Sequence, residues 1–354
     1  MSLDPHGDLV VLLRALVDVE SVSGNETALA DQVESALQGH EHLEVLRDGD
    51  TVIARTHLGR PERVVIAGHL DTVPVAGNLP SSLAGDRVYG RGTCDMKGGV
   101  AVMLAVAVAA TTPPRDLTWI FYDHEEVEAS ANSLTRIASE RPDLLVGDFA
   151  VLMEPTSAKV EGGCQGTLRF TVTTKGKAAH SARAWMGHNA IHDLAEVLAV
   201  LRDHEPEQPV VDGLRYHEGL NAVAVTGGIA GNVIPDTATV SVNYRFAPHR
   251  SLADAEHYCR SLLPDHDLTI TDGAAGARPG LDVPAAATFV DAVGGEPSAK
   301  FGWTDVARFS ALGVPAVNFG PGDPSKAHAD DEFCPIDELY TCRAALLRWL
   351  DRPA

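Results

Sequence analysis

The sequence has few positive charges for its length. It contains 28 Lys and Arg residues against 49 Asp and Glu residues, which gives a formal net charge of −21 at pH 7. A chain this acidic repels nucleic acid and anionic membrane surfaces, and no basic cluster offsets the charge. We therefore expect neither nucleic acid nor a membrane among its partners.

Cysteine and long apolar stretches are also scarce. The five cysteines are odd in number and form no CxxC pair, which favours reduced thiols in the cytoplasm over a disulfide framework. The longest apolar run, residues 100–110, is too short to span a bilayer. The N-terminus lacks a charged region followed by an apolar stretch, so no signal peptide is predicted. We expect a cytoplasmic protein.

Several catalytic motifs are missing. There is no P-loop and no GxSxG, which argues against a nucleotide hydrolase and a serine hydrolase. The stretch "HEEVE" has glutamate where an HExxH zinc motif needs its second histidine. The stretch "GRGTCD" has Asp95 in place of the third glycine of a dinucleotide fingerprint, and its charge would repel a pyrophosphate.

The length of 354 residues predicts two domains, and the hydrophobic pattern divides the chain accordingly. Continuous Val/Ile runs separated by helices predict a buried α/β sheet in the first and last parts of the chain. Helices are expected at 9–19, 26–37, from 96 onward, 284–293, 304–312 and 336–350. Strands are expected at 51–55, 63–68, 117–122, 149–153 and 315–320.

The middle of the chain alternates in a different pattern. Its predicted elements follow the order βαββαβ, which is that of a small ferredoxin-like unit. We therefore predict an α/β catalytic domain in two pieces, residues 1–165 and 281–354. The ferredoxin-like domain, residues 166–280, is inserted between them, and "DGAAGARPG" is the linker back.

Histidine and carboxylate side chains recur where predicted strands end or a helix begins. The carboxyl ends of strands line the ligand crevice of open α/β sheets, so residues scattered along the chain are expected to converge. The five stretches are "GHLDT" with His69 and Asp71, "TCDMKGG" with Asp95, "YDHEEVE" with Glu125 and Glu126, "MEPT" with Glu154, and "AHADDEF" with His328.

These side chains suit a pair of metal ions. Two cations about 3.5–4 Å apart need a bridging carboxylate and further N or O ligands on each. We assign His69 and Glu154 to one cation and His328 and Glu126 to the other, with Asp95 as the bridge. A mixed His and carboxylate set favours Zn, Co or Mn over Ca or Mg.

Two further acids have roles beside the cations. Glu125 and Glu126 are adjacent and point opposite ways on an extended segment, so Glu125 can act as general base and then general acid. Asp71 lies two residues after His69, where its carboxylate can accept the free imidazole N–H.

Each of these features has a simpler explanation when taken alone. Asp95 could be a helix cap, "DHEEVE" a solvated acidic turn and His69 a structural histidine. A protein of another class, a metal-free scaffold, would purify without stoichiometric zinc. All of these groups share one position relative to their strands, which favours a single common site over a separate explanation for each group.

The stretches "GHLDT", "YGRGTCDMKGG", "HEEVE", "MEPT" and the late "AH" before an acidic run resemble the M20 family of di-zinc amidohydrolases. The resemblance covers nearly the whole chain. It implies a zinc-peptidase-like catalytic domain with an inserted lid and dimerisation domain. It also implies two Zn²⁺ per subunit, which Co²⁺ can replace. The implied ligands are His69, Asp95, Glu126, Glu154 and His328, with Glu125 as acid/base and Asp71 orienting His69.

The resemblance assigns further residues that spacing alone does not. His180 in "KAAHSA" is expected to polarise the scissile carbonyl, and in dimeric members it comes from the partner subunit. Arg245 in "NYRF" is expected to bind a substrate carboxylate, although a surface ion pair is the alternative. Asn232 and Thr304 are expected to line the substrate site. A homodimer through the inserted domain follows.

Within the family, "EGGCQGTLRF" and "GGIAGNVIPDTATVSVNYRFAP" are most similar to actinobacterial enzymes that hydrolyse N-succinyl-L,L-2,6-diaminopimelate for lysine biosynthesis. N-acetylornithine or another N-acyl amino acid or dipeptide is the alternative small-molecule substrate. His124 stands where the family usually has an acid. The stretch "GGCQG" itself contains no arginine, unlike that region of some family members, so Arg183 in "SARAW" is a candidate for the second substrate carboxylate.

Overall fold

The computed structural model describes residues 3–353 and divides the chain into two compact units. The first unit comprises Met1–Gly162, Pro279–Ser298 and Arg308–Ala354, and the second comprises Gly163–Arg278 and Ala299–Ala307. The short segment Ala299–Ala307 groups with the second unit, whereas the sequence assigned all of 281–354 to the catalytic domain. Each unit is described by itself below.

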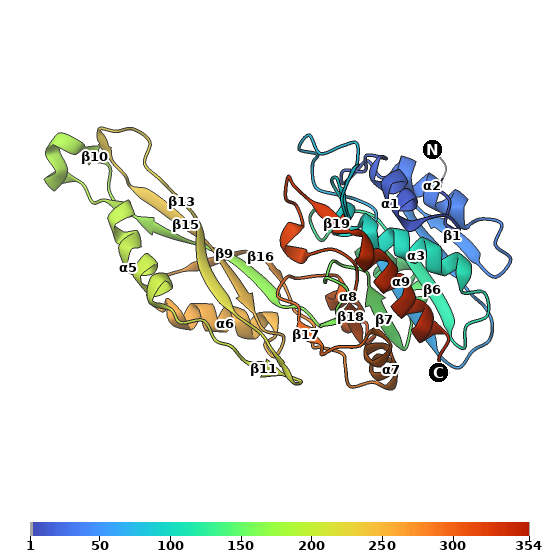
Figure 1. Cartoon of the computed structure of the whole chain (residues 1–354). Coiled ribbons are helices and arrows are strands. Elements are labelled where there is room, and N and C mark those ends of the chain that lie inside the picture. Colours follow the sequence, from blue (N-terminus) through green and yellow to red (C-terminus); the bar gives the residue numbers. More distant parts are fainter. Residues whose placement is uncertain (1–2, 354) are drawn as a thin grey trace. The chain divides into compact units, whose positions relative to one another are not determined.

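A mixed eight-stranded sheet forms the centre of the first unit (Figure 1). Its strands, in spatial order, are β1 (Glu44–Asp48), β2 (Thr51–Arg55), β6 (Asp116–Tyr122), β3 (Arg63–His69), β7 (Phe149–Leu152), β18 (Ala316–Asn318), β8 (Glu161–Gly162) and β17 (Ser298–Ala299). The neighbours β6, β3, β7 and β18 run parallel, so their carboxyl ends meet at one edge. That edge positions the candidate site.

Helices accompany this sheet along the chain. They are α1 (Leu9–Val17), α2 (Thr27–Leu37), α3 (Gly98–Ala109), α4 (Ser133–Glu140), α7 (Pro284–Val293), α8 (Val306–Ala311) and α9 (Ile336–Leu350). Helix α1 begins at Asp8, whose side chain accepts the backbone N–H groups of Val10 and Val11. Helix α3 is buried on all sides up to Val108, which explains its Ala/Val/Gly composition.

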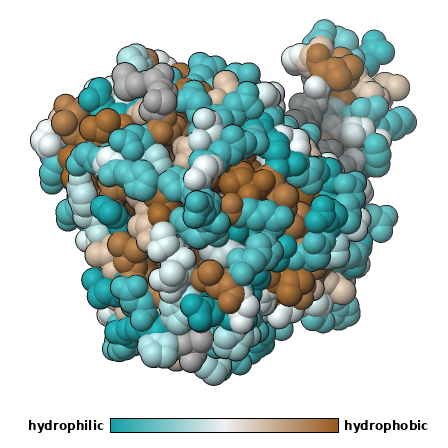
Figure 2. All heavy atoms as spheres, turned by 90° about the vertical axis from the view of Figure 1, so that its right-hand side faces the viewer, coloured by the Kyte–Doolittle hydropathy of each residue, from teal (hydrophilic) through white to brown (hydrophobic). Residues whose placement is uncertain are grey.

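One continuous apolar core joins α1, α2, α3, α7 and α9 to alternate residues of the sheet. Trp349 of α9 is fully buried, with its ring centroid 4.9 Å from that of Phe289 and 5.9 Å from that of Phe149. Aromatic pairs at these separations stabilise a core beyond the area that they bury. The face shown in Figure 2 is mostly hydrophilic, with small apolar patches between polar side chains.

Smaller elements complete the first unit. A three-stranded sheet consists of β19 (Phe333–Pro335), β5 (Arg87–Tyr89) and β4 (Ser82–Ala84). Short helical turns occur at Thr93–Lys97, Pro142–Leu144 and Pro324–Lys326. The sequence predicted none of these elements, and it also missed β1 and α4. Within residues 3–353, no helix is long and apolar enough to cross a membrane.

The second unit has a four-stranded antiparallel sheet with two helices on one face. Its sheet order is β13 (Gly219–Gly227), β15 (Thr237–Phe246), β9 (Gly166–Lys175) and β16 (Leu268–Ala274). Helices α5 (Ala190–Asp203) and α6 (Leu252–Leu262) pack on the buried alternate residues of these strands. Along the chain the order is β9-α5-β13-β15-α6-β16. Two short strand pairs are β10 (Ala179–His180) with β14 (Val233–Ile234), and β11 (Val210–Val211) with β12 (Leu214–Arg215).

Candidate metal centre

Asp95 lies between two histidines. Its Oδ1 is 3.2 Å from His69 Nε2, and its Oδ2 is 3.4 Å from His328 Nε2. The two oxygens of one carboxylate therefore face different imidazoles. This is the arrangement by which a carboxylate joins two neighbouring cations.

Two more carboxylates complete two groups that share Asp95. Glu154 joins His69 and Asp95, with one ligand atom of each within 4.8 Å of the others. Glu126 joins Asp95 and His328 in the same way, and its carboxylate lies 3.0 Å from His328 Nε2. The structure therefore brings the five predicted ligands together as two overlapping triads.

The parallel strands account for this convergence. His69 is the last residue of β3, Glu154 follows β7 after one residue, and the turn with Glu126 follows β6. Because β6, β3 and β7 are parallel neighbours, these side chains share one edge of the sheet. Asp95 reaches the same edge from the turn Thr93–Lys97, directly before α3.

A glycine allows the start of α3 to approach the end of β7. A Cβ atom at Gly99 would lie 2.3 Å from the carbonyl oxygen of Met153, so only glycine fits there without displacing the backbone. This contact places the segment of Asp95 beside the segment of Glu154.

Asp71 has two connections to the centre. His69 Nδ1 lies 3.0 Å from the backbone carbonyl of Asp71 and 3.5 Å from its carboxylate. The carboxylate accepts the backbone N–H groups of Glu125 and Glu126, each at 3.0 Å, and the Ser23 hydroxyl at 2.6 Å. Burial by itself raises the pKa of Asp71, but the hydrogen bond and charge of His69, followed by the hydrogen bonds from Ser23 and the Glu126 backbone, lower it to about 2. Asp71 thus holds the Glu125–Glu126 turn as a charged acceptor, a contact that the sequence did not predict.

Glu125 is next to the ligands. One of its carboxylate oxygens lies within 4.8 Å of ligand atoms of both His69 and Glu126. The preceding His124 has φ +60°, and its Nδ1 lies 2.7 Å from Asp123 Oδ2. This hydrogen bond gives the His124 imidazole its own acidic partner.

The residues predicted in the second unit lie in different places. His180 and Asn232 are close, because His180 pairs with Val233 across β10 and β14 and Ser181 N–H donates to the Asn232 carbonyl at 2.9 Å. Arg245 lies near the far end of β15. Thr304 is buried, and its carbonyl oxygen lies 3.7 Å from Cys164 Sγ. His180 and Asn232 are therefore neighbours within this unit.

The model of peptidase family M20/M25/M40 matches residues 65–352. This chain belongs to the M20 family. The match begins in β3 and includes every ligand of both triads. The M20 family consists of metal-dependent peptidases, which agrees with the donor set at this edge of the sheet.

Relatives and a solved structure are similar to this M20 chain over nearly its full length. The protein named succinyl-diaminopimelate desuccinylase in Mycobacterium tuberculosis is 51% identical, covering 98% of this chain and 99% of the relative. The Corynebacterium glutamicum protein of that name is 46% identical, covering 98% and 97%. A dinuclear metal-binding M20 peptidase from Bacillus subtilis has the same fold, with a TM-score of 0.72, 17% identity, and coverage of 97% and 96%.

The electrostatics of the triads fit cations. Hydrogen bonds with Asp95 and Glu126 raise the pKa of His328 to about 10. Burial raises the pKa of Asp95, but its contacts with His328 and His69 lower it well below the ordinary value. The carboxylates therefore attract positive charge to the positions of the imidazole nitrogens. A divalent cation satisfies the same attraction once the histidines are neutral.

The sequence did not single out some residues of this M20 site. The Glu332 carboxylate accepts the backbone N–H of Asp95, and the Arg91 guanidinium donates a hydrogen bond to the same carboxylate. Both side chains are buried. Glu332 stands only four residues after His328, but an acidic run is usually solvated, so its composition carries no signal for a buried role.

Proposed function

We propose that this M20 chain hydrolyses N-succinyl-L,L-2,6-diaminopimelate to succinate and L,L-2,6-diaminopimelate, a step of lysine biosynthesis. The two relatives described above support the substrate through 51% and 46% identity over 98% of the chain. The observation that carries the chemistry is the position of Asp95 between two triads, because hydrolysis of an unactivated amide benefits from two adjacent cations.

We infer that the cations are zinc, with cobalt as a functional substitute. His69 and Glu154 would hold one, His328 and Glu126 the other, and Asp95 both. When bound, the pair lowers the pKa of a water molecule and polarises the substrate carbonyl. Imidazole and carboxylate ligands suit Zn²⁺ and Co²⁺ better than Mg²⁺ or Ca²⁺.

Glu125 moves the proton. Its carboxylate removes a proton from the attacking water, whose oxygen bonds to the succinyl amide carbon. Glu125 then delivers that proton to the amide nitrogen as the carbon–nitrogen bond breaks, which releases the amine and succinate. The hydrogen bonds from the backbone of Glu125 and Glu126 to Asp71 fix the turn that aims this carboxylate.

The second unit supplies recognition in this proposal. His180 donates a hydrogen bond to the developing oxyanion, and Arg245 binds a substrate carboxylate, with Asn232 and Thr304 lining the site. Burial, and next the neighbouring charge of Arg169, lower the pKa of Arg245. A bound carboxylate would relieve both effects, which supports Arg245 as an anion ligand.

Two copies of the chain are needed if His180 and Arg245 contact one substrate. The β15 residues Thr237 and Arg245 are eight positions apart, which is about 26 Å at 3.3 Å per residue. His180 lies on the Thr237 side, where β10 and β14 pair (Figure 1). A small N-acyl amino acid does not span that distance. We therefore infer that His180 acts on the site of a partner subunit.

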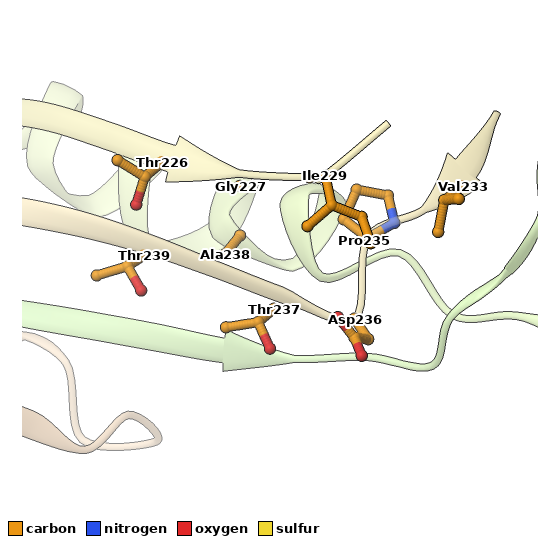
Figure 3. Close-up of a pocket in the computed structure, with 10 residues that line it drawn as sticks. Thr226, Gly227, Ile229, Val233, Pro235, Asp236, Thr237, Ala238 and Thr239 are labelled. Atoms are coloured by element: carbon orange, nitrogen blue, oxygen red, sulfur yellow. The ribbon is translucent and has the colours of Figure 1, made fainter. Parts of the chain in front are cut away.

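Strand β13 is the surface that we propose for dimerisation. It forms an edge of the four-stranded sheet, and its sequence GLNAVAVTG has no charge. Val223 and Val225 are 63% and 52% exposed. Uncharged, apolar edge strands readily pair with another strand. At one end of this edge, β13, β15 and the segment between them, which includes the exposed Ile229, line a pocket of about 290 Å³ (Figure 3).

The arrangement of the second unit supports a ferredoxin-like domain that serves as lid and dimerisation module. Its order βαββαβ and its helix-covered face leave the other sheet face and the β13 edge available. We propose that this domain closes over the substrate, as in other two-domain hydrolases. A cytoplasmic location remains part of the proposal.

The decisive experiment compares hydrolysis of N-succinyl-L,L-2,6-diaminopimelate with that of N-acetylornithine. The purified chain is assayed after zinc loading and after chelation. We expect strong, zinc-dependent release of succinate and weak deacetylation. A preference for the acetyl substrate would contradict the proposed substrate and keep the metal centre. Activity on either substrate that survives chelation would contradict the metal mechanism.

A further inference from the structure

A buried ion pair connects two loops of the metal centre. Arg91 Nη1 lies 3.0 Å from Glu332 Oε2, and the two residues are 3% and 1% exposed. Burying two charges is costly unless further hydrogen bonds satisfy them. The remaining partners of this pair therefore indicate what it does.

Glu332 holds the backbone at the shared ligand. Its Oε1 accepts the N–H of Cys94 at 2.9 Å and the N–H of Asp95 at 3.1 Å. Its own carbonyl accepts the N–H of Gly90 at 3.1 Å. The Glu332 side chain thus fixes the peptide groups from which the Asp95 carboxylate projects.

Arg91 holds the loop of His328. Its Nη1 also donates to the carbonyl of Ala329 at 3.2 Å, and its Nε donates to the carbonyl of Pro74 at 3.1 Å. Ala329 directly follows His328, which has φ +66° and a side chain that is 53% exposed. Burial does little to hold the His328 side chain in place. The hydrogen bond from Arg91 to the carbonyl of the adjacent Ala329 therefore restrains its position.

The other ligands are held differently. His69 belongs to β3, whose ladder to β6 includes His69 opposite Tyr122. Glu154 follows Met153, whose N–H donates to the Ala67 carbonyl of the same sheet at 2.9 Å. The sheet thus fixes His69 and Glu154, whereas Asp95 and His328 depend on loops. The ion pair is a direct link between these two loops.

We propose that Arg91 and Glu332 are positioning residues that set the separation of Asp95 from His328. They control chiefly the affinity of the cation held by Asp95, Glu126 and His328. The cation held by His69, Asp95 and Glu154 depends on them less, because the sheet fixes two of its three ligands. This inference rests on the proposed metal centre and does not depend on the identity of the substrate.

A second buried arginine, Arg115, and its glutamate partner provide the control. Arg115 is 1% exposed and bonds Glu62 through Nε at 3.0 Å. Its other donors bind backbone carbonyls near the C-terminus, including that of Trp349 at 3.2 Å. Glu62→Gln therefore removes a charge beside a buried arginine without touching a ligand segment, although Glu62 itself is 27% exposed.

The experiment measures binding of Zn²⁺ to the metal-free full chain by competition with a chromophoric chelator. We expect Glu332→Gln to weaken one of two zinc sites about 10- to 100-fold, the usual range for groups that orient ligands, and the other site much less. Glu62→Gln should leave both dissociation constants unchanged. Melting temperatures are recorded for both variants, so a general loss of stability is separated from a loss at one site.

Some results would overturn the inference. Wild-type zinc affinities in Glu332→Gln would do so, as would equal weakening of both sites or the same effect in Glu62→Gln. If Glu332→Gln does not fold, Arg91→Lys keeps one cationic donor and loses the planar fork. It should weaken the same single site, and unchanged affinities would count against the proposal. A wild-type chain that binds no zinc would instead contradict the proposed metal centre.

Discussion

Most of the predicted functional residues differ in setting between the two units, although His328 of the first unit is 53% exposed and Thr304 of the second is buried. In the first unit, His69, Glu154 and Asp71 are 1%, 5% and 0% exposed, and strand ends and buried hydrogen bonds fix them. In the second unit, His180 is exposed on a strand of only two residues, and Trp185 nearby is 81% exposed. A preorganised centre and an exposed recognition surface have different requirements. The proposed metal centre relies on contacts of its own unit, whereas our proposal has a partner subunit cover the exposed recognition residues.

The largest effect is expected from removing the shared ligand. Asp95→Asn keeps the shape of the side chain but removes the charge that faces both histidines, so both cations should be lost. We expect activity to fall by at least about a thousandfold, since the cations supply both nucleophile and carbonyl polarisation. Zinc content and kcat/KM of the purified protein are the measurements.

The matched control for Asp95→Asn is Asp330→Asn, in the exposed acidic run two residues after His328. This variant should keep full zinc content and rate. Retention of two zinc ions by Asp95→Asn would show that the carboxylate does not bridge. The contrast between the units would then be weaker, because the centre would not depend on one buried charge.

The next effect separates metal binding from proton transfer within the first unit. Glu125→Gln should keep both cations and lower kcat about 10²- to 10⁴-fold, because an amide cannot accept the proton of the attacking water. Glu128→Gln, an exposed acid three residues later, should behave as wild type. Near-normal kcat in Glu125→Gln would assign the proton transfer to another group.

The sequence predicted the first unit well for a physical reason. Strands β2, β3, β6 and β7 are continuous apolar runs, and parallel strands bring their ends together whatever their distance along the chain. The convergence of the five candidate ligands was therefore predictable from their positions after strands or before a helix. The M20 family and the hydrolase function also followed from these motifs.

Other parts of the site had no such signal. Glu332 and Arg91 are polar residues in loops, and only the tertiary contact with Asp95 reveals their burial. The short strands β4, β5 and β19 are three residues each and lack a periodic pattern. The role of Asp71 as acceptor for the Glu125–Glu126 turn depends on side-chain direction, which spacing along one strand does not specify.

A smaller effect tests whether the second unit needs a partner. His180→Ala should lower kcat about 10²-fold, the usual loss for one oxyanion donor, with zinc content unchanged. Mixing His180→Ala chains with Glu125→Gln chains should recover activity, because one site of the mixed dimer then has both groups intact. The control is His192→Ala, at another exposed histidine of this unit, which should leave kcat and zinc content unchanged.

Absence of recovery in the mixed dimer, with chain exchange demonstrated, would place His180 on its own site. A His180 that acts on its own site would have to share one substrate with Arg245 across the distance of about 26 Å along β15. Arg245 would be the first assignment to revise, because the two residues could no longer serve one substrate from different chains.

The smallest effect concerns the β13 edge, where one charge should separate the chains without unfolding them. Val225 is 52% exposed, so Val225→Lys should change the free energy of unfolding by no more than about 0.5 kcal/mol. Two lysines brought together across paired edges would repel, and charge is the usual protection of an edge strand. We expect a weakened dimer by sedimentation. At assay concentrations where part of the protein is monomeric, activity should fall about tenfold, less than in His180→Ala because the remaining dimers keep His180 in place, and high protein concentration should restore it by mass action. Leu83→Lys, at a 51% exposed residue of the first unit, should leave the dimer intact. A Val225→Lys protein that stays dimeric would move the interface away from β13, and the exposed apolar residues of this strand would then need another partner.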